Sequence, residues 1–191
     1  MENHIINELN QALSNLPGIT KKTAAKISQH LLKMEPQEVA NLIKAIEKVK
    51  NYVFICDHCH YIATDYLCNI CLDNNRNKNQ LMIVETINDV DKIEQGEFYN
   101  GEYFVWEQAI DKKQNAPLEL KSNDWDYINT HTNIILALSP NLQGEIKSEF
   151  LINKLKNKNI SKLAIGLPFG SQIDYIDEIT LKQAFENRKK I

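Results

Sequence analysis

Four cysteines are the residues whose type and spacing point most directly to chemistry. They form two Cys-x-x-Cys pairs separated by eight residues: Cys56, Cys59, Cys68 and Cys71. Each pair places two sulfur atoms on one side of a tight turn, and two such pairs complete a tetrahedral site of the kind that holds Zn²⁺. Because four protein ligands leave no position for water, we expect one structural zinc ion per chain.

Two other uses of the cysteines are less consistent with this spacing. A thioredoxin-like redox site needs one Cys-x-x-Cys pair at a helix N-terminus rather than two spaced pairs. Disulfide bonds are disfavoured in a reducing cytosol. With four thiolates available as ligands, the neighbouring His58 and His60 are interpreted as exposed spacers.

Three lysines follow a short turn near the N-terminus. The turn is Leu16-Pro17-Gly18-Ile19, and Lys21, Lys22 and Lys26 come directly after it. A glycine-containing turn that opens a helix lets backbone N–H groups face a phosphate, and the ammonium groups add positive charge at the same end. This combination suits sequence-independent binding of a nucleic-acid backbone. The alternative is a plain helical turn with a solvated lysine face, which the turn alone does not exclude.

Two glutamates lie where an α/β domain places its chemistry. Glu85 follows the apolar run 81–84, and Glu145 follows the run 134–138. The carboxyl ends of parallel strands carry the active sites of such domains, so this pair suggests a Mg²⁺-dependent nuclease or nucleotidyl transferase as an alternative function. Acids are not clustered there, and neither a phosphate-binding loop nor a nucleophile elbow is present in the sequence. We therefore expect no enzyme.

The spacing of apolar residues predicts the elements that position these groups. Apolar residues at three- and four-residue steps predict helices over 5–16, from about 22 to 34, and from Pro36 to about 49. Pro36 suits the first turn of the third helix because its φ angle is fixed. Periodicity then stops through the cysteine window, and residues 73–77 are typical of a loop.

An α/β pattern follows the cysteine window. Short strands are predicted over 81–84, 103–106, 134–138 and 163–165, and helices over 88–93, 146–155 and 181–185. Asn88 and Thr180 are the expected N-caps of the first and last of these helices. A strand, helix and strand within so short a stretch form a βαβ crossover, which implies parallel pairing.

Composition limits the remaining possibilities. The chain has 191 residues, 43% hydrophobic and 25% charged, which fits a globular protein of one ordinary domain or two small ones. Its net charge of −3 means that nucleic acid would be bound by local basic patches rather than by the whole molecule. The sequence has no membrane-length apolar run and does not begin with a secretory signal, so we expect a cytoplasmic protein.

In this order, the motifs resemble the RecR family of bacterial recombination mediators. The residues that carry the resemblance are the hairpin 16–19, the segment 30–32, the finger ending at 68–71, and the segments 166–168 and 175–181. The resemblance implies an α/β multidomain fold in four parts. These are a helix-hairpin-helix domain (1–52), a C4 zinc finger (53–78), a Toprim domain (79–170) and a C-terminal strand-helix segment for oligomerisation (171–191).

The resemblance also implies a function. Members are DNA-repair proteins that form a ring-shaped homo-oligomer, expected to be a tetramer, around single- or double-stranded DNA. With RecO and RecF they help load the recombinase onto single-stranded DNA. By position, Lys22 and Lys26 match the DNA-facing basic residues of the family, and Glu85 and Glu145 match the Toprim acids, which contact partner proteins.

Overall fold

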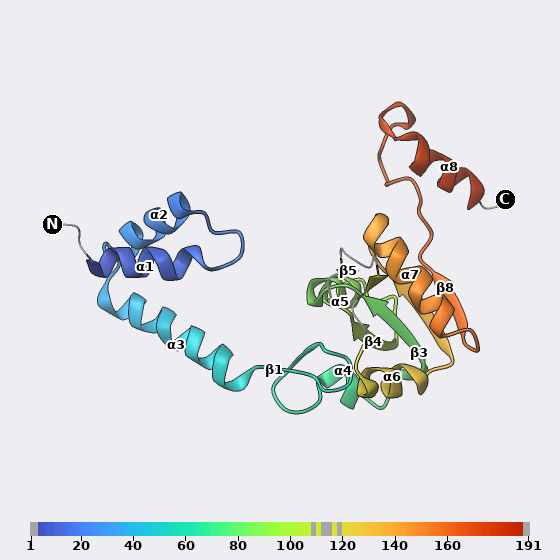
Figure 1. Ribbon diagram of the computed structural model, residues 1–191, viewed down its shortest axis with the longest axis horizontal. Coiled ribbons are helices and arrows are strands. Elements are labelled where there is room, and N and C mark those ends of the chain that lie inside the picture. The colour runs from blue at the N-terminus through green and yellow to red at the C-terminus, as the bar shows by residue number, and fades with distance from the viewer. Residues whose placement is uncertain (1–3, 108–109, 112–115, 118–119, 189–191) are drawn as a thin grey trace. The chain divides into compact units, whose positions relative to one another are not determined.

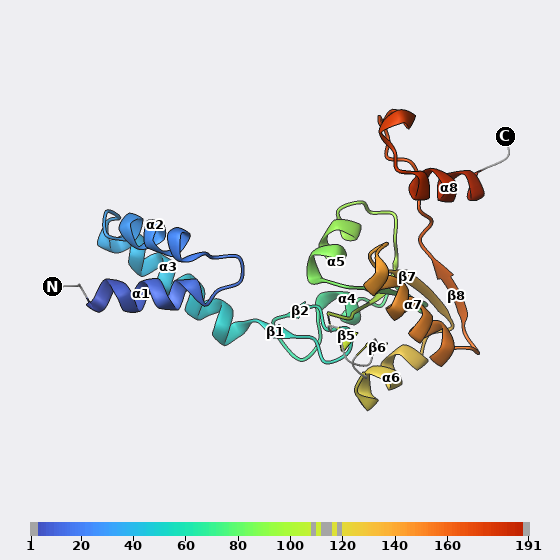
Figure 2. The same cartoon turned by 45° about the horizontal axis from the view of Figure 1, so that its top comes forward.

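Residues 4–107, 110–111, 116–117 and 120–188 are described by a computed structural model, in which the chain divides after Val53 into two units. The first unit consists of three helices: α1 (His4–Ser14), α2 (Lys21–Leu31) and α3 (Pro36–Tyr52). All three predicted helices are thus confirmed. Helices α1 and α2 lie side by side in both views (Figures 1 and 2).

The turn between α1 and α2 has the features that its sequence requires. Gly18 has a φ of +77°, a conformation that glycine adopts without steric penalty. Thr20 is the N-cap of α2, and its side chain accepts a hydrogen bond of 3.2 Å from the N–H of Thr23. This bond satisfies one of the free N–H groups of the first turn.

The second unit begins with a small finger. Strands β1 (Phe54–Ile55) and β2 (Ile62–Ala63) form an antiparallel hairpin, and the one-turn helix α4 (Asn69–Leu72) follows. The loop predicted over residues 73–77 is confirmed for 73–76, and Asn77 is already the first residue of the strand that follows. Arg76 in this loop forms an ion pair with Glu94, which ties the loop to the α/β layer.

A four-stranded parallel sheet forms the centre of the second unit. Its strands, in the spatial order β4-β3-β7-β8, are β3 (Asn77–Val84), β4 (Gly101–Val105), β7 (Asn133–Ala137) and β8 (Asn159–Lys162). The helices of the layer are α5 (Ile87–Glu94), α6 (Ser122–Asn129) and α7 (Leu142–Lys154), and the pair β5 (Ile110–Asp111) and β6 (Ala116–Pro117) is antiparallel. The predicted parallel α/β layer is confirmed.

Both faces of this sheet are buried, and each face has its own core. Along β3, Leu81 and Ile83 pack with residues of α6 and α7, whereas Met82 and Val84 pack with α5 and the cysteines of the finger. Successive side chains of a strand point to opposite faces, so a run of apolar residues is what a doubly covered strand requires. The finger is therefore part of the core of the second unit.

Two sequence predictions about the positions of elements in the second unit were wrong. The N-cap of α5 is Thr86, not Asn88, and its side chain accepts a hydrogen bond from the N–H of Asp89. Strand β8 lies at 159–162 rather than 163–165, although the N–H of Leu163 still donates to the carbonyl of Leu136. Polar residues at 159, 161 and 162 hid this strand, because it pairs with β7 alone at the sheet edge.

The C-terminal segment also differs from its prediction. No strand occurs among its described residues, and Ile173–Tyr175 instead form a 3₁₀ helix, η1. The final helix, α8 (Glu178–Glu186), is capped by Asp177 and not by Thr180, whose N–H donates to the Asp177 side chain at 2.9 Å. Of the helices within the described ranges, none is long and apolar enough to cross a membrane.

Candidate metal centre and nucleic-acid interface

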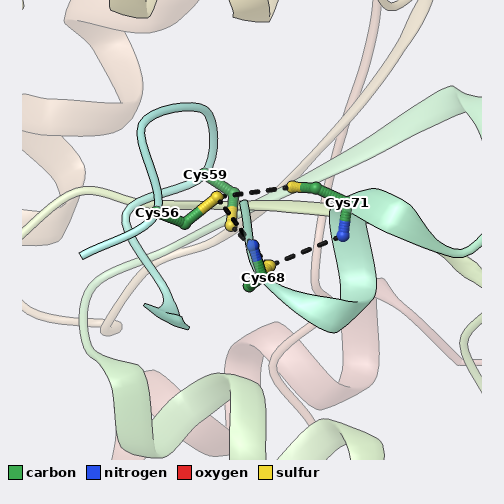
Figure 3. A group of neighbouring side chains, drawn as sticks. All are labelled: Cys56, Cys59, Cys68 and Cys71. Atoms are coloured by element: carbon green, nitrogen blue, oxygen red, sulfur yellow. Dashed lines mark hydrogen bonds between the residues drawn. The ribbon is translucent and has the colours of Figure 1, made fainter. Parts of the chain in front are cut away.

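The four predicted cysteines converge on one point. Their Sγ atoms all lie within 4.8 Å of one another, and Figure 3 shows the four side chains pointing together. The Sγ atoms of Cys56 and Cys71 are 3.8 Å apart, and those of Cys59 and Cys68 are 3.4 Å apart. A tetrahedral site with metal–sulfur bonds of about 2.3 Å has sulfur–sulfur edges of about 3.8 Å. The four cysteines therefore fit a single metal ion.

Local backbone structure holds each cysteine pair in place. The first pair lies in a turn that His60 closes, with a φ of +61° and an N–H that donates to the Cys56 carbonyl at 3.0 Å. The second pair opens α4, where Cys68 is the N-cap and its Sγ accepts from the N–H of Cys71 at 3.5 Å. The two pairs thus use different turns to present their sulfur atoms to the same point.

The four thiols shift one another's pKa values strongly. Hydrogen bonds with the other three thiols, chiefly Cys59, hold the pKa of Cys56 below its ordinary value. For Cys68, the bond with Cys56 raises the pKa, but the bonds with Cys59 and Cys71 outweigh it and lower the pKa to about 7. A lowered pKa favours the thiolate, which is the form that binds metal ions. The same contacts, together with burial, raise the pKa values of Cys59 and Cys71, so the case for a metal ion rests on the distances between the four sulfur atoms.

Residues outside the cysteine window surround the centre. The Nζ of Lys78 donates to the Cys71 carbonyl at 2.9 Å, and the hydroxyl of Tyr127 lies 3.8 Å from the Cys71 Sγ. Burial raises the pKa of Tyr127, so this hydroxyl stays protonated and is able to donate to a thiolate. Sequence reasoning missed both residues, because no motif marks Lys78, seven residues after Cys71, and Tyr127 lies 56 residues after Cys71.

The two histidines beside the cysteines differ from each other. His58 is exposed, as predicted, and its ring stacks on Tyr127 with centroids 5.2 Å apart. The prediction for His60 was wrong: it is half-buried, and its Nε2 lies 3.1 Å from Oδ1 of Asp124, which is only 3% exposed. His60 thereby links the finger to helix α6.

The three predicted lysines lie together on helix α2. Lys21, Lys22 and Lys26 are all exposed, and the first turn of this helix contains no acidic residue. Free N–H groups and the positive end of the helix dipole lie at the same end as Lys21 and Lys22. The arrangement can bind phosphate groups without reading base sequence.

Glu85 is bound within the protein. Both its oxygens are used: Oε2 accepts from the N–H of Ser139 at 3.0 Å and from the Ser139 hydroxyl, and Oε1 accepts from Lys147 Nζ at 3.1 Å. Burial raises the pKa of Glu85, but the bonds from Ser139 and Lys147 outweigh burial and leave the pKa below its ordinary value. Glu85 is therefore an ionised, internally paired carboxylate.

Glu145 makes an ion pair of its own. It lies in the first turn of α7, its side chain is 50% exposed, and it pairs with Lys162 of β8 at 2.5 Å. The two glutamates thus pair with different lysines, Glu85 with Lys147 and Glu145 with Lys162. Sequence reasoning missed Lys147, although its spacing of four residues before Leu151, which is buried, was a signal that it faces the core.

Comparisons with known proteins agree with this architecture. The family model described as "RecR, helix-hairpin-helix" matches residues 6–50, "Toprim domain" matches 79–164, and "RecR, C-terminal" matches 166–189. A protein named "Recombination protein RecR" from Mycoplasmopsis pulmonis is 40% identical over 99% of this chain and 100% of its own length. The chain belongs to the RecR family.

Other RecR family members are similar over nearly the same length. The "Recombination protein RecR" of Natranaerobius thermophilus is 36% identical over 97% of this chain and 96% of its own length. That of Cytophaga hutchinsonii is 38% identical over 92% of this chain and 89% of its own length. The resemblance predicted from the motifs is confirmed, and the cysteine centre lies between the helix-hairpin-helix and Toprim ranges.

Proposed function

We propose that this chain is the DNA-binding subunit of a non-enzymatic recombination mediator that works as a ring-shaped clamp. The single observation that carries the proposal is the exposed lysine cluster Lys21, Lys22 and Lys26 at the start of α2, in a chain of the RecR family. The clamp would be a homo-oligomer, expected to be a tetramer, around single- or double-stranded DNA in the cytoplasm. Its role would be to promote recombinase loading with RecO and RecF.

The proposed division of labour follows four domains. Residues 1–52 would bind DNA, and the finger 53–78 would connect them to the Toprim domain. The Toprim domain, 79–170, would contact partner proteins, and residues 171–191 would join subunits. Exposed apolar residues in the first and last of these support subunit contacts; among them are Ile43, Ile46, Ile179 and Phe185. Of the two Toprim glutamates, Glu145 would offer partner proteins the more accessible carboxylate, because its side chain is 50% exposed and that of Glu85 is 17% exposed.

Zinc is the metal that we propose for the cysteine centre. Four sulfur ligands in a tetrahedron are typical of zinc or of an iron–sulfur cluster, and the sulfur atoms here are close enough for one ion. All four positions would be filled by protein, so the ion would stabilise the finger rather than act on substrate. Metal analysis and the visible spectrum of the purified protein distinguish zinc from an iron–sulfur cluster.

DNA titration of paired variants tests the proposal. Lys22→Glu/Lys26→Glu should weaken binding of single- and double-stranded DNA at least about tenfold and lower the salt dependence of binding by about two phosphate contacts. The control Lys33→Glu/Lys44→Glu makes the same charge change elsewhere in the first unit and should have a smaller effect. Equal affinities of wild type and Lys22→Glu/Lys26→Glu would remove α2 from the mechanism.

Light scattering with and without DNA tests the clamp. We expect an oligomer that keeps its size in Lys22→Glu/Lys26→Glu, because these side chains point to solvent. A monomer at every concentration, with DNA present, would contradict a clamp. Incubation with supercoiled DNA and Mg²⁺ or Mn²⁺ tests the absence of catalysis, since cleavage that Glu85→Gln abolishes would support a nuclease instead.

A further inference from the structure

A buried lysine lies at the carboxyl end of the parallel sheet. Lys147 is only 5% exposed, and its Nζ donates to Glu85 Oε1 at 3.1 Å and to the Trp106 carbonyl at 3.3 Å. The same Nζ lies 5.4 Å from the centroid of the Trp106 ring, a cation–π distance. Lysine is almost never fully buried unless it is paired, so these contacts define a site built for an ammonium group.

Three neighbouring strands supply the surroundings of this ammonium. Glu85 follows β3, Trp106 follows β4, and Ser139, which binds Glu85, follows β7. Helix α7 carries Lys147 and approaches the carboxyl edge of the sheet closely at Gly144. A Cβ atom at Gly144 would lie only 1.9 Å from the Ser139 carbonyl oxygen, so only glycine fits there. The carboxyl edge of such a sheet is where an α/β enzyme binds its ligands.

A Toprim domain that cleaves DNA would need a divalent cation at this edge, and the residues present do not fit one. Mg²⁺ requires several oxygen ligands in a near-octahedral arrangement. Both oxygens of Glu85 already accept hydrogen bonds, and Glu145 pairs with Lys162. Among the described residues, the cysteines form the only group of three or more His, Cys, Asp or Glu side chains close enough to share an ion.

We propose that the Lys147 ammonium group permanently takes the place of a divalent cation at this edge and makes the Toprim domain independent of metal. Lys147 carries a fixed positive charge to Glu85, binds one of its oxygens and fills the space beside the Trp106 carbonyl. Glu85 is then the counter-ion of Lys147 and is withheld from solvent cations. This proposal concerns the non-catalytic Toprim edge and is independent of whether α2 binds DNA.

Titration of the full-length, metal-loaded protein with Mn²⁺ tests the proposal. Mn²⁺ prefers oxygen ligands and binds more weakly than Zn²⁺ to common sites, so it leaves a thiolate centre intact and is counted by electron paramagnetic resonance. We expect wild type and Lys147→Arg to bind no Mn²⁺ at this edge. Lys147→Met, which keeps the length and apolar stem of the side chain but frees Oε1 of Glu85, should gain a Mn²⁺ site with an affinity at least about tenfold above the detection limit, which the other two proteins do not reach.

Variants of Glu85 test whether any Mn²⁺ binding takes place at the carboxyl edge of the sheet. Lys147→Met/Glu85→Gln should lose the Mn²⁺ binding that Lys147→Met gains, and should melt at a higher temperature than Lys147→Met because no unpaired carboxylate remains. Mn²⁺ binding by wild type that Glu85→Gln removes would overturn the proposal, and so would its absence from folded Lys147→Met. If Lys147→Met itself does not fold, the double variant Lys147→Met/Glu85→Gln decides. If the double variant also fails to fold, the loss of Lys147 does not act through the unpaired Glu85, and the proposal is rejected.

Discussion

The two units of the chain bury their side chains to different extents. Within residues 4–53, only Ala24 and Ser28 are buried, and Ile46 and Val49 of α3 are each 61% exposed. The second unit has a core on each face of its sheet, one of which includes three of the cysteines. The second unit thus has apolar cores of its own, whereas the first leaves nearly all of its charged and apolar side chains at least partly exposed.

Loss of one cysteine should have the largest effect. Cys68 is 1% exposed, caps α4 and packs against the sheet, so Cys68→Ser would remove one of the four proposed metal ligands and disturb a core. Structural zinc binds with about 10–16 kcal/mol, which rivals the whole stability of a domain at about 5–15 kcal/mol. We expect metal content below one ion per chain and loss of cooperative unfolding in the second unit, measured by metal analysis and amide hydrogen exchange.

His58→Ala is the matched control for Cys68→Ser. His58 is exposed and is not needed as a ligand, so the variant should keep its metal and its melting temperature. Protection of the amides of α1 to α3 should survive Cys68→Ser. Collapse of that protection together with the sheet would mean that the first unit depends on the second, and the contrast drawn above would fail.

A buried ion network should give the next largest effect. Glu102, which is 5% exposed, binds His131 Nε2 and Lys78 Nζ at 2.7 Å each, and His131 is fully buried. Glu102→Ala leaves His131 without this partner, which should lower the free energy of unfolding by about 3–5 kcal/mol. Urea unfolding measures the loss.

Lys78→Met is the control for the exposed half of this network, and it also removes the hydrogen bond from Lys78 to the Cys71 carbonyl. The Lys78 side chain is 43% exposed, so its pair with Glu102 is screened by water and should contribute less than about 1 kcal/mol. Equal losses in Glu102→Ala and Lys78→Met would show that burial of His131 does not govern the network.

Much of the fold was predictable because its signals are local. The three helices of the first unit follow from apolar spacing and Pro36, and the cysteine centre follows from two Cys-x-x-Cys pairs. Strand β8 was placed about four residues late, because an edge strand carries few apolar residues and the run after it looked more strand-like.

What escaped prediction depends on contacts between distant segments. Lys147 reaches Glu85 across sixty-two residues, and Glu102 reaches His131 across twenty-nine. Single residues of these types carry no spacing signal, since their partners are brought close only when the sheet forms. His60 illustrates the same limit, because its role beside Asp124 follows from the position of α6.

Acid should weaken the second unit through Glu85 and Glu94. Burial raises the pKa of Glu94, but bonds from Arg76 and Tyr103 outweigh it, so both glutamates have a folded pKa below the ordinary value of 4.5. Their stabilisation is fully present above pH 4.5 and is lost as the pH falls through the folded pKa. Urea unfolding between pH 7 and pH 3 should show this fall, and Glu94→Gln should make it shallower. If the free energy of unfolding falls just as steeply with pH in Glu94→Gln as in wild type, Glu94 is excluded as a cause.

The smallest effect is expected at the start of α2, in the first unit. Thr20→Ala removes the side-chain acceptor for the Thr23 N–H, and loss of such a cap typically costs about 1 kcal/mol. Thr20→Ser keeps the acceptor and should be close to neutral. Because so few side chains are buried in residues 4–53, this small loss should raise amide exchange throughout α2 and leave the strand β3 unchanged. Faster exchange in β3 would show that the two units share stability, and unchanged exchange in α2 would show that the cap does not support the helix that carries the lysines.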